Sequence, residues 1–449
     1  MSSINLDEKI EYRGYWYLPS TPSNSVAGIV TYYPNDKIVL ELIGSFGKSF
    51  IDIFKNSNEE TVIYGKTSDA KNITLLKCHQ YSSLNFSAGF PIVRFNCEYM
   101  IVGKHIAGLE EKHQYWAMVR IPELTYWCHP EAIEMTLYNA NGEEYSKISL
   151  SCSTKYRDEE NVIKEVQIDK ITSIALIKGV KFDESKRRLN PQMEQYTYIE
   201  IHKNNTSSIN ELLSDIHMFE QFLSFATLNI VKCSSITIYD KDFYQEDNNQ
   251  KYYRPINVIH PFFERQKMEN KLVNKYDFLF DYVTIKDVYP ELLKKWYNEP
   301  TELAPIRGHL ISSLERKKVY SSVDFLIVVQ AIEGFYRRFR SAKYRKEHKF
   351  SGKASSKLHP ILTDLLSEFS DIDLLNRNVI DVDSVVDSRI YFSHFMPKTS
   401  NLKAIDGWDL IAETRKLRIL LLCCVLSFLG FNNSQINDIL NNSDSSLFV

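Results

Sequence analysis

An arginine and a histidine stand five residues apart in the segment Arg389-Ile-Tyr-Phe-Ser-His394. A histidine titrates near neutral pH, so His394 can take a proton from a 2′-hydroxyl of RNA or give one to the leaving oxygen. The guanidinium of Arg389 stays charged and can stabilise the negative charge of a phosphorane-like transition state. The chemistry open to this pair is the cleavage of RNA without a metal ion.

The helix expected to carry this pair does not bring the two side chains together. We predict a helix over 382–395, because a proline follows closely and helices usually end before a proline. Five residues turn an ideal helix by about 500°, which leaves the side chains about 140° apart. They converge only if the helix ends or distorts near His394, or if a second copy supplies partners across a two-fold axis. Spacing alone favours a simpler interpretation, in which Arg389 pairs with Asp387 or Asp383 and His394 caps the helix.

A basic segment over 337–357 precedes this helix. It holds nine lysines and arginines against Glu347 alone, a net charge of +8, with Phe339, Tyr344 and Phe350 among them. Such a segment offers contacts to phosphates together with aromatic surfaces on which bases stack. A solvated helix end followed by a loop is an equally weighted alternative.

The net charge of the whole chain does not reveal this basic segment. Its 449 residues carry 54 basic and 57 acidic side chains, a net charge of −3 that would disfavour a nucleic-acid ligand. Residues 286–449 hold 23 basic and 20 acidic side chains, whereas residues 1–285 hold 31 and 37. The C-terminal part is therefore basic and the N-terminal part acidic, so the total charge does not exclude nucleic acid.

The periodicity of the apolar residues changes along the chain. Short β-rich runs separated by turn residues continue over 10–202, at the spacing of an all-β sandwich or barrel. Apolar residues then recur every three or four positions over 207–228. This spacing predicts an amphipathic helix capped by Ser207 or Ser208.

From Val288 onward the pattern is helical. The last long helix, over 403–429, is apolar on almost all sides and ends at Gly430, as a central bundle helix would. We therefore predict an α+β protein. A β-rich, sandwich-like module of one or two domains is expected over 1–285, followed by an all-α bundle over 286–449.

Other classes of protein and site lack support. The first residues form no apolar secretory signal, and the longest apolar run, over 419–429, is too short for a membrane span. Seven irregularly spaced cysteines suit a reducing cytoplasm. Neither a glycine-rich phosphate loop nor a zinc-binding spacing is present, so we expect no cofactor and no metal. Four histidines scattered among the strands are interpreted as structural: His79, His105, His113 and His129.

Two parts of the chain resemble one known family. The stretch FLIVVQAIEGFYR at 325–337, with the acidic Glu333, resembles the early long helix of the ApeA-like branch of the HEPN ribonucleases. The stretch VVDSRIYFSH at 385–394 is similar to the catalytic segment of that branch. Three N-terminal stretches resemble the opening of the ApeA N-terminal domain: GYWYLP at 14–19, GIVT at 28–31 and LELIGSF at 40–46.

The resemblance implies an anti-phage protein that acts by abortive infection, and it favours a functional Arg389–His394 pair. The C-terminal domain would be a HEPN ribonuclease that cleaves cellular RNA, with tRNA among the candidates, without a metal, leaving a 2′,3′-cyclic phosphate. His394 would be the general acid and base, and Arg389 would stabilise the transition state. Auxiliary polar residues would be Asp387, Ser393 and Glu333. The RNA backbone would be held by Arg337, Arg338, Arg340, Lys343, Arg345, Lys346 and Lys349.

The resemblance also implies partners. HEPN ribonucleases commonly dimerise through this domain, so both motifs face one composite cleft, which answers the 140° separation. We therefore expect a homodimer or a higher homo-oligomer. The ApeA-like N-terminal domain would act as a sensor and keep the nuclease inactive until a phage-derived trigger appears. No membrane partner is expected.

One position departs from the family pattern. The residue after the arginine is often Asn, His or Asp in HEPN motifs, and here it is Ile390, which removes a hydrogen-bonding group. This departure favours a rival interpretation. In it, a HEPN-like bundle without catalytic activity serves in dimerisation or nucleotide binding, and the β-rich module binds a protein or glycan.

Overall fold

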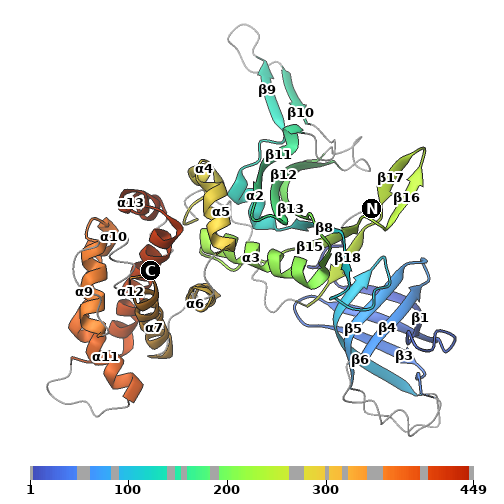
Figure 1. The fold of residues 1–449 in the computed structure, drawn as a ribbon, viewed down its shortest axis with the longest axis horizontal. Coiled ribbons are helices and arrows are strands. Elements are labelled where there is room, and N and C mark those ends of the chain that lie inside the picture. Colours follow the sequence, from blue (N-terminus) through green and yellow to red (C-terminus); the bar gives the residue numbers. More distant parts are fainter. Residues whose placement is uncertain are drawn as a thin grey trace. The chain divides into compact units, whose positions relative to one another are not determined.

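Two compact units make up the structure, a computed structural model (Figure 1). One unit comprises residues 1–220 and 231–269, and the other comprises 221–230 and 270–449. The first is rich in strands and the second is helical, which confirms the predicted α+β class. The structure describes residues 4–47, 61–81, 91–138, 147–152, 159–182, 192–261, 278–298, 303–315, 322–340, 357–394 and 403–443.

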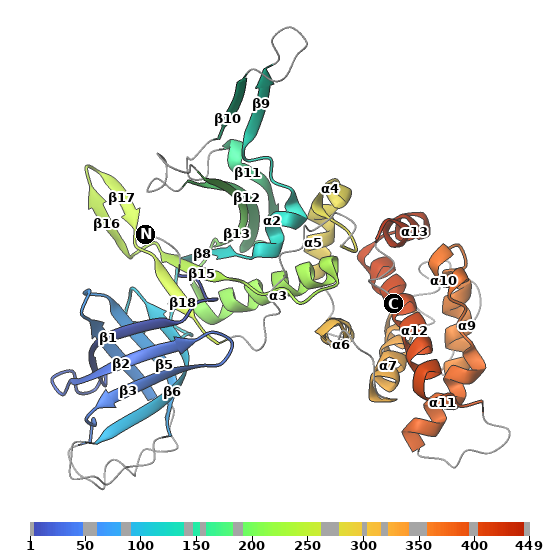
Figure 2. The same cartoon turned by 180° about the vertical axis from the view of Figure 1, so that it is seen from behind.

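The first six strands close into an antiparallel barrel. They are β1 (Ile10–Tyr17), β2 (Val26–Tyr33), β3 (Lys37–Ile43), β4 (Thr61–Thr67), β5 (Asn72–Gln80) and β6 (Ile92–Val102). β1 pairs with β2 and β4, β6 pairs with β3 and β5, and the pairs β2–β3 and β4–β5 complete the circle. Figure 2 shows β1, β2 and β3 side by side on one wall. Closure pairs the strand edges that an open sheet would leave exposed.

The same strand β6 also leads into an open sheet. Every pair of neighbours in this sheet is antiparallel. From β6 outward the strands are β18 (Ile256–Ile259), β15 (Ser235–Asp240), β8 (Tyr115–Arg120), β13 (Met193–Lys203), β12 (Thr172–Phe182) and β11 (Val162–Gln167).

The strand-rich unit also contains smaller elements. They include the short α-helix α2 (Pro122–Cys128) and the 3-10 helix η1 (Glu159–Asn161). Three short strand pairs are β7 (Lys112–His113) with β14 (Ser207–Ser208), β9 (Glu134–Tyr138) with β10 (Lys147–Ser151), and β16 (Tyr244–Asp247) with β17 (Gln250–Tyr253).

The amphipathic helix predicted over 207–228 is α3 (Ile209–Thr227). Its apolar stripe is buried, as the three- to four-residue spacing requires. Ser208 accepts a hydrogen bond at Oγ from the N–H of Glu211 at 3.2 Å, and Oε2 of Glu211 accepts one from the N–H of Ser208 at 3.0 Å. Ser208 is thus the N-cap, in a reciprocal capping box.

The helical unit is built around α12 (Gly407–Leu429). Residues 419–426 of α12 are all buried, and the helix ends at Gly430, whose φ of 107° is left-handed. Within the described residues, no helix is both long and apolar enough to cross a membrane. The other helices are α4 (Tyr282–Ile285), α5 (Tyr289–Tyr297), α6 (Ala304–Glu315), α7 (Ser322–Phe339), α9 (Leu358–Glu368), α10 (Asp373–Arg377), α11 (Val382–His394) and α13 (Asn433–Asn442).

The barrel depends on a close approach between Trp16 and Gly65. Trp16 is fully buried and lies directly opposite Gly65 on the neighbouring strand β4. A Cβ at position 65 would overlap two carbons of the indole ring of Trp16. Glycine at this position leaves room for the largest aromatic side chain of the barrel.

We predict that Gly65→Ala destabilises the strand-rich unit by about 1–3 kcal/mol, because the added methyl group overpacks the barrel. Gly108→Ala is the matched control, since nothing lies within 4 Å of a Cβ there. Its effect should stay within about 0.5 kcal/mol. Urea unfolding followed by tryptophan fluorescence measures both, and equal midpoints for the two variants would contradict the packing argument.

Candidate functional site

Arg389 and His394 lie on one continuous helix. α11 runs from Val382 to His394, so it neither ends nor breaks between the two residues. Regular helix geometry therefore keeps their side chains about 140° apart. The side chain of Arg389 is 32% exposed, and His394 is exposed at the last turn. The helix ends at His394, as the first route to convergence requires, and a second copy of the chain is the other route.

A buried carboxylate on α7 holds Arg389. Glu333 is 8% exposed, and its Oε2 lies 3.8 Å from Nη2 of Arg389. Its Oε1 lies 3.5 Å from Nη2 of Arg337, one helical turn later. Two guanidinium groups thus share one carboxylate. The structure brings the predicted auxiliary residue Glu333 to the predicted arginine.

The other two predicted auxiliary residues bind the chain's own backbone. Oδ2 of Asp387 accepts a hydrogen bond from the N–H of Lys403 at 2.8 Å. Oγ of Ser393 donates to the carbonyl oxygen of Arg389 at 2.5 Å. Within the described residues, the ion-pair partner of Arg389 is Glu333, and neither Asp387 nor the other candidate carboxylate on α11 takes that role.

The sequence did not predict a cluster of charged side chains at the start of α11. Oδ1 of Asp383 lies 3.3 Å from Nε2 of His359, and its Oδ2 lies 2.9 Å from Nζ of Lys403. The hydrogen bond and charge of Lys403 hold the pKa of the Asp383 carboxyl below its usual range. The three residues come from α9, α11 and the segment before α12, so no local spacing could have indicated them.

The described end of the basic segment divides into exposed and buried arginines. Arg337 and Arg338 are exposed at the end of α7. Arg340 is 1% exposed, and its Nη2 donates to Oε1 of Glu368 at 2.6 Å and to Oγ of Ser427 at 3.1 Å. The expectation that Arg340 binds RNA is corrected, because its charge is neutralised inside the bundle. The remaining predicted contacts lie outside the described residues: Lys343, Arg345, Lys346 and Lys349.

Metal ligands do not gather around Arg389 in the described part of the chain. The described residues contain one group of three His, Cys, Asp or Glu side chains close enough to share an ion, namely His113, Asp240 and Asp242. That group belongs to the strand-rich unit. The groups beside Arg389 in the described residues are the Glu333 carboxylate and the Arg337 guanidinium that shares it.

Comparison with known families gives matches in both parts of the chain. The model of ApeA N-terminal domain 1 matches residues 11–296, which is more than half of the sequence. The chain belongs to the ApeA family. The Apea-like HEPN model matches residues 326–435. No curated protein and no solved structure gives a match.

The HEPN match encloses the candidate site. It begins within α7 and ends within α13, so Glu333, Arg389 and His394 all lie inside it. HEPN is generally a ribonuclease fold, and HEPN domains commonly dimerise and bind RNA. The ApeA N-terminal match ends within α5, whereas the compact units part at residues 269 and 270. The boundary predicted near residue 285 lies between these two positions.

The buried ion pair of Arg340 predicts a stability role. Arg340→Met leaves the Glu368 carboxylate, 12% exposed, without its cation. Breaking such a pair should lower the free energy of unfolding of the helical unit by about 3–5 kcal/mol. Arg338→Ala, an exposed neighbour, should change it by no more than about 0.5 kcal/mol. Urea unfolding followed by circular dichroism checks this, and a wild-type midpoint for Arg340→Met would refute the structural role.

Proposed function

We propose that this chain is an anti-phage defence protein whose HEPN part, residues 286–449, is a metal-independent endoribonuclease. The match to the ApeA-like HEPN family supports the defence role and the ribonuclease fold. The observation that carries the proposal is the position of Arg389. It lies partly exposed on the helix that presents His394, held by a buried carboxylate within the family match.

His394 is the general acid and base of the proposed reaction. The imidazole takes the proton of a ribose 2′-hydroxyl, and the 2′-oxygen attacks the adjacent phosphorus. The bond from phosphorus to the 5′-oxygen then breaks, and a proton returns to that oxygen. The products are a 2′,3′-cyclic phosphate and a 5′-hydroxyl, and no metal ion takes part in this scheme. The charged guanidinium of Arg389 stabilises the extra negative charge on the phosphoryl oxygens in the transition state.

Two copies of the chain form the proposed cleft. Arg389 and His394 of one chain lie about 140° apart around α11, and a second chain would bring a histidine and an arginine to one phosphate. A two-fold axis places the histidine of one protomer opposite the arginine of its partner, and the reverse, giving two equivalent sites. A homodimer through the HEPN domain is thus part of the mechanism.

Phosphate contacts come from the basic segment at the end of α7. Arg337 and Arg338 are exposed there, and Lys343, Arg345, Lys346 and Lys349 extend the proposed contacts along the sequence. These side chains bind the RNA backbone without reading its sequence. Cellular RNA, with tRNA as one candidate, is therefore the proposed substrate class.

The strand-rich part, residues 1–285, is the proposed sensor. It keeps the ribonuclease inactive until it meets a phage-derived trigger, and cleavage of host RNA then arrests the infected cell. The match to ApeA N-terminal domain 1 over 11–296 and the order of the domains support this regulatory role. The reaction takes place in the cytoplasm, where cellular RNA is available.

Removing either group of the pair should abolish cleavage. His394→Ala should lower the rate of RNA cleavage by about 10²–10⁴-fold, because it removes proton transfer. Arg389→Ala should lower it by about 10²–10³-fold through lost transition-state stabilisation. His359→Ala, an exposed histidine of the same unit, is the control and should cleave at the wild-type rate. Gel assays on total RNA with EDTA present make the measurement. Equal cleavage by His394→Ala and wild type would exclude His394 as the catalytic group, and no cleavage by wild type would favour the rival non-catalytic role in dimerisation or nucleotide binding.

A mixture of two inactive variants should recover activity. An Arg389→Ala chain still supplies His394, and a His394→Ala chain still supplies Arg389, so a mixed dimer holds one intact composite site. After subunit exchange at equal amounts, cleavage should return to about a quarter of the wild-type rate. The same assay on each variant alone is the control. An inactive mixture, with mixed dimers demonstrated by differential tags, would show that one chain supplies both groups.

A further inference from the structure

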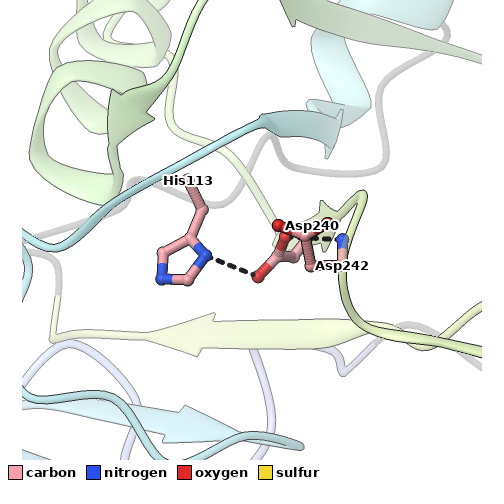
Figure 3. A group of neighbouring side chains, drawn as sticks. All are labelled: His113, Asp240 and Asp242. Atoms are coloured by element: carbon pink, nitrogen blue, oxygen red, sulfur yellow. Dashed lines mark hydrogen bonds and ion pairs between the residues drawn. The ribbon is translucent and has the colours of Figure 1, made fainter.

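Figure 3 shows three side chains gathered where β7 and β15 end. His113 is the last residue of β7, Asp240 is the last residue of β15, and Asp242 follows in the next turn. One ligand atom from each lies within 4.8 Å of the other two. Atoms that share one transition-metal ion lie at most about 4.4 Å apart, given bonds of about 2.0–2.2 Å. Small rotations of the three side chains would therefore bring these atoms within reach of one ion.

His113 lies between two carboxylates. Its Nε2 lies 2.8 Å from Oε1 of Glu111, and its Nδ1 lies 3.3 Å from Oδ2 of Asp240. If Nε2 donates its hydrogen to Glu111, Nδ1 presents a lone pair to the second carboxylate. Two acceptors then face each other, an arrangement that requires a proton or a cation between them. A carboxylate that fixes the far nitrogen of a histidine is also the usual support of a metal-binding imidazole.

The charges of the cluster do not balance. Asp240 is fully buried, and its Oδ2 lies 2.7 Å from Nζ of Lys104. Its Oδ1 accepts a hydrogen bond from the N–H of Asp242 at 2.9 Å. Among the described residues, the Asp242 carboxylate has no ion-pair partner. Three carboxylates, counting Glu111, thus face one ammonium group, which leaves two negative charges when His113 is neutral.

Tyr115 supplies an independent observation. It is 1% exposed, and its hydroxyl has no hydrogen-bond partner in the described part of the chain. Tyr115 pairs directly with Asp240 across the β8–β15 ladder, and its ring lies 5.4 Å from that of His113. A buried hydroxyl without a partner needs an acceptor, and a water molecule bound to a metal ion would supply one.

We propose that His113, Asp240 and Asp242 form a site for a divalent transition-metal ion, with Glu111 orienting the imidazole. The imidazole nitrogen together with carboxylate oxygens favours Zn²⁺ or Mn²⁺ over Mg²⁺ or Ca²⁺, which prefer oxygen ligands alone. The dication neutralises the two excess charges, and the Lys104 ammonium swings away from Asp240. Tyr115 donates its hydrogen to a water molecule on the ion.

The proposed ion joins segments that are far apart in the sequence. His113 precedes β8, whereas Asp240 and Asp242 precede the β16–β17 hairpin, so the ion fixes the base of that hairpin to the sheet. It would act as a structural clamp within the strand-rich unit, since binding to the folded state alone stabilises it. This role does not depend on the proposed ribonuclease activity.

Metal titration of the full-length, untagged chain tests the site. The protein is dialysed against EDTA and then titrated with ZnCl₂ or MnCl₂ by calorimetry, with thermal unfolding measured in parallel. We expect one equivalent of one of these ions to bind and to raise the melting temperature. His113→Ala and Asp242→Asn should each weaken binding by about tenfold or more. Because the Asp242 side chain is exposed, Asp242→Asn should fold even if His113→Ala does not.

Two further variants separate a metal site from an ordinary charge cluster. His202→Ala removes a histidine that is 26% exposed and pairs with a buried glutamate, much as His113 is 23% exposed, and it should bind metal like wild type. Lys104→Met removes the competing cation and should bind metal at least as tightly as wild type. Absence of stoichiometric binding to the wild-type chain would overturn the proposal. So would an equal loss of binding in His113→Ala and His202→Ala.

Discussion

The continuous helix α11 determines the directions in which the side chains of Arg389 and His394 leave the helix axis. Backbone hydrogen bonds fix the rotation of each residue about the helix axis, so the angle of about 140° can change only if a turn of the helix breaks. The proposed reaction needs both groups at one phosphate, and this angle is the reason for proposing that two chains supply them.

The buried carboxylate of Glu333 on α7 forms an ion pair with Arg389 on α11. An unpaired buried charge is costly, so the carboxylate needs cations, and it takes one from α7 and one from α11. The pairing packs the two helices together and keeps Arg389 at a fixed, partly exposed position. In the proposed reaction, the partly exposed guanidinium of Arg389 would be open to a phosphate group.

Local patterns predicted the helices well and the long-range contacts poorly. The three- to four-residue periodicity located α3 and its Ser208 cap, since both depend on residues within a few turns. Closure of the barrel depends on β1 meeting β4 and β6 meeting β3, which no local pattern encodes. The grouping of His113 with Asp240 was missed for the same reason. Asp240 lies on a strand far from His113 in the sequence, so the two residues form no motif with a metal-binding spacing.

Arg340 shows how far a charge run can differ from a charged surface. The run over 337–357 has a net charge of +8, yet Arg340 is neutralised by Glu368 inside the bundle, and Arg337 shares Glu333 with Arg389. Electrostatic binding of RNA depends on the number of phosphates that exposed cations contact. The proposed RNA binding of the HEPN part would therefore use fewer charges than the sequence contains. Burial decides which of the charged side chains stay exposed, and burial depends on helices that are distant in the sequence.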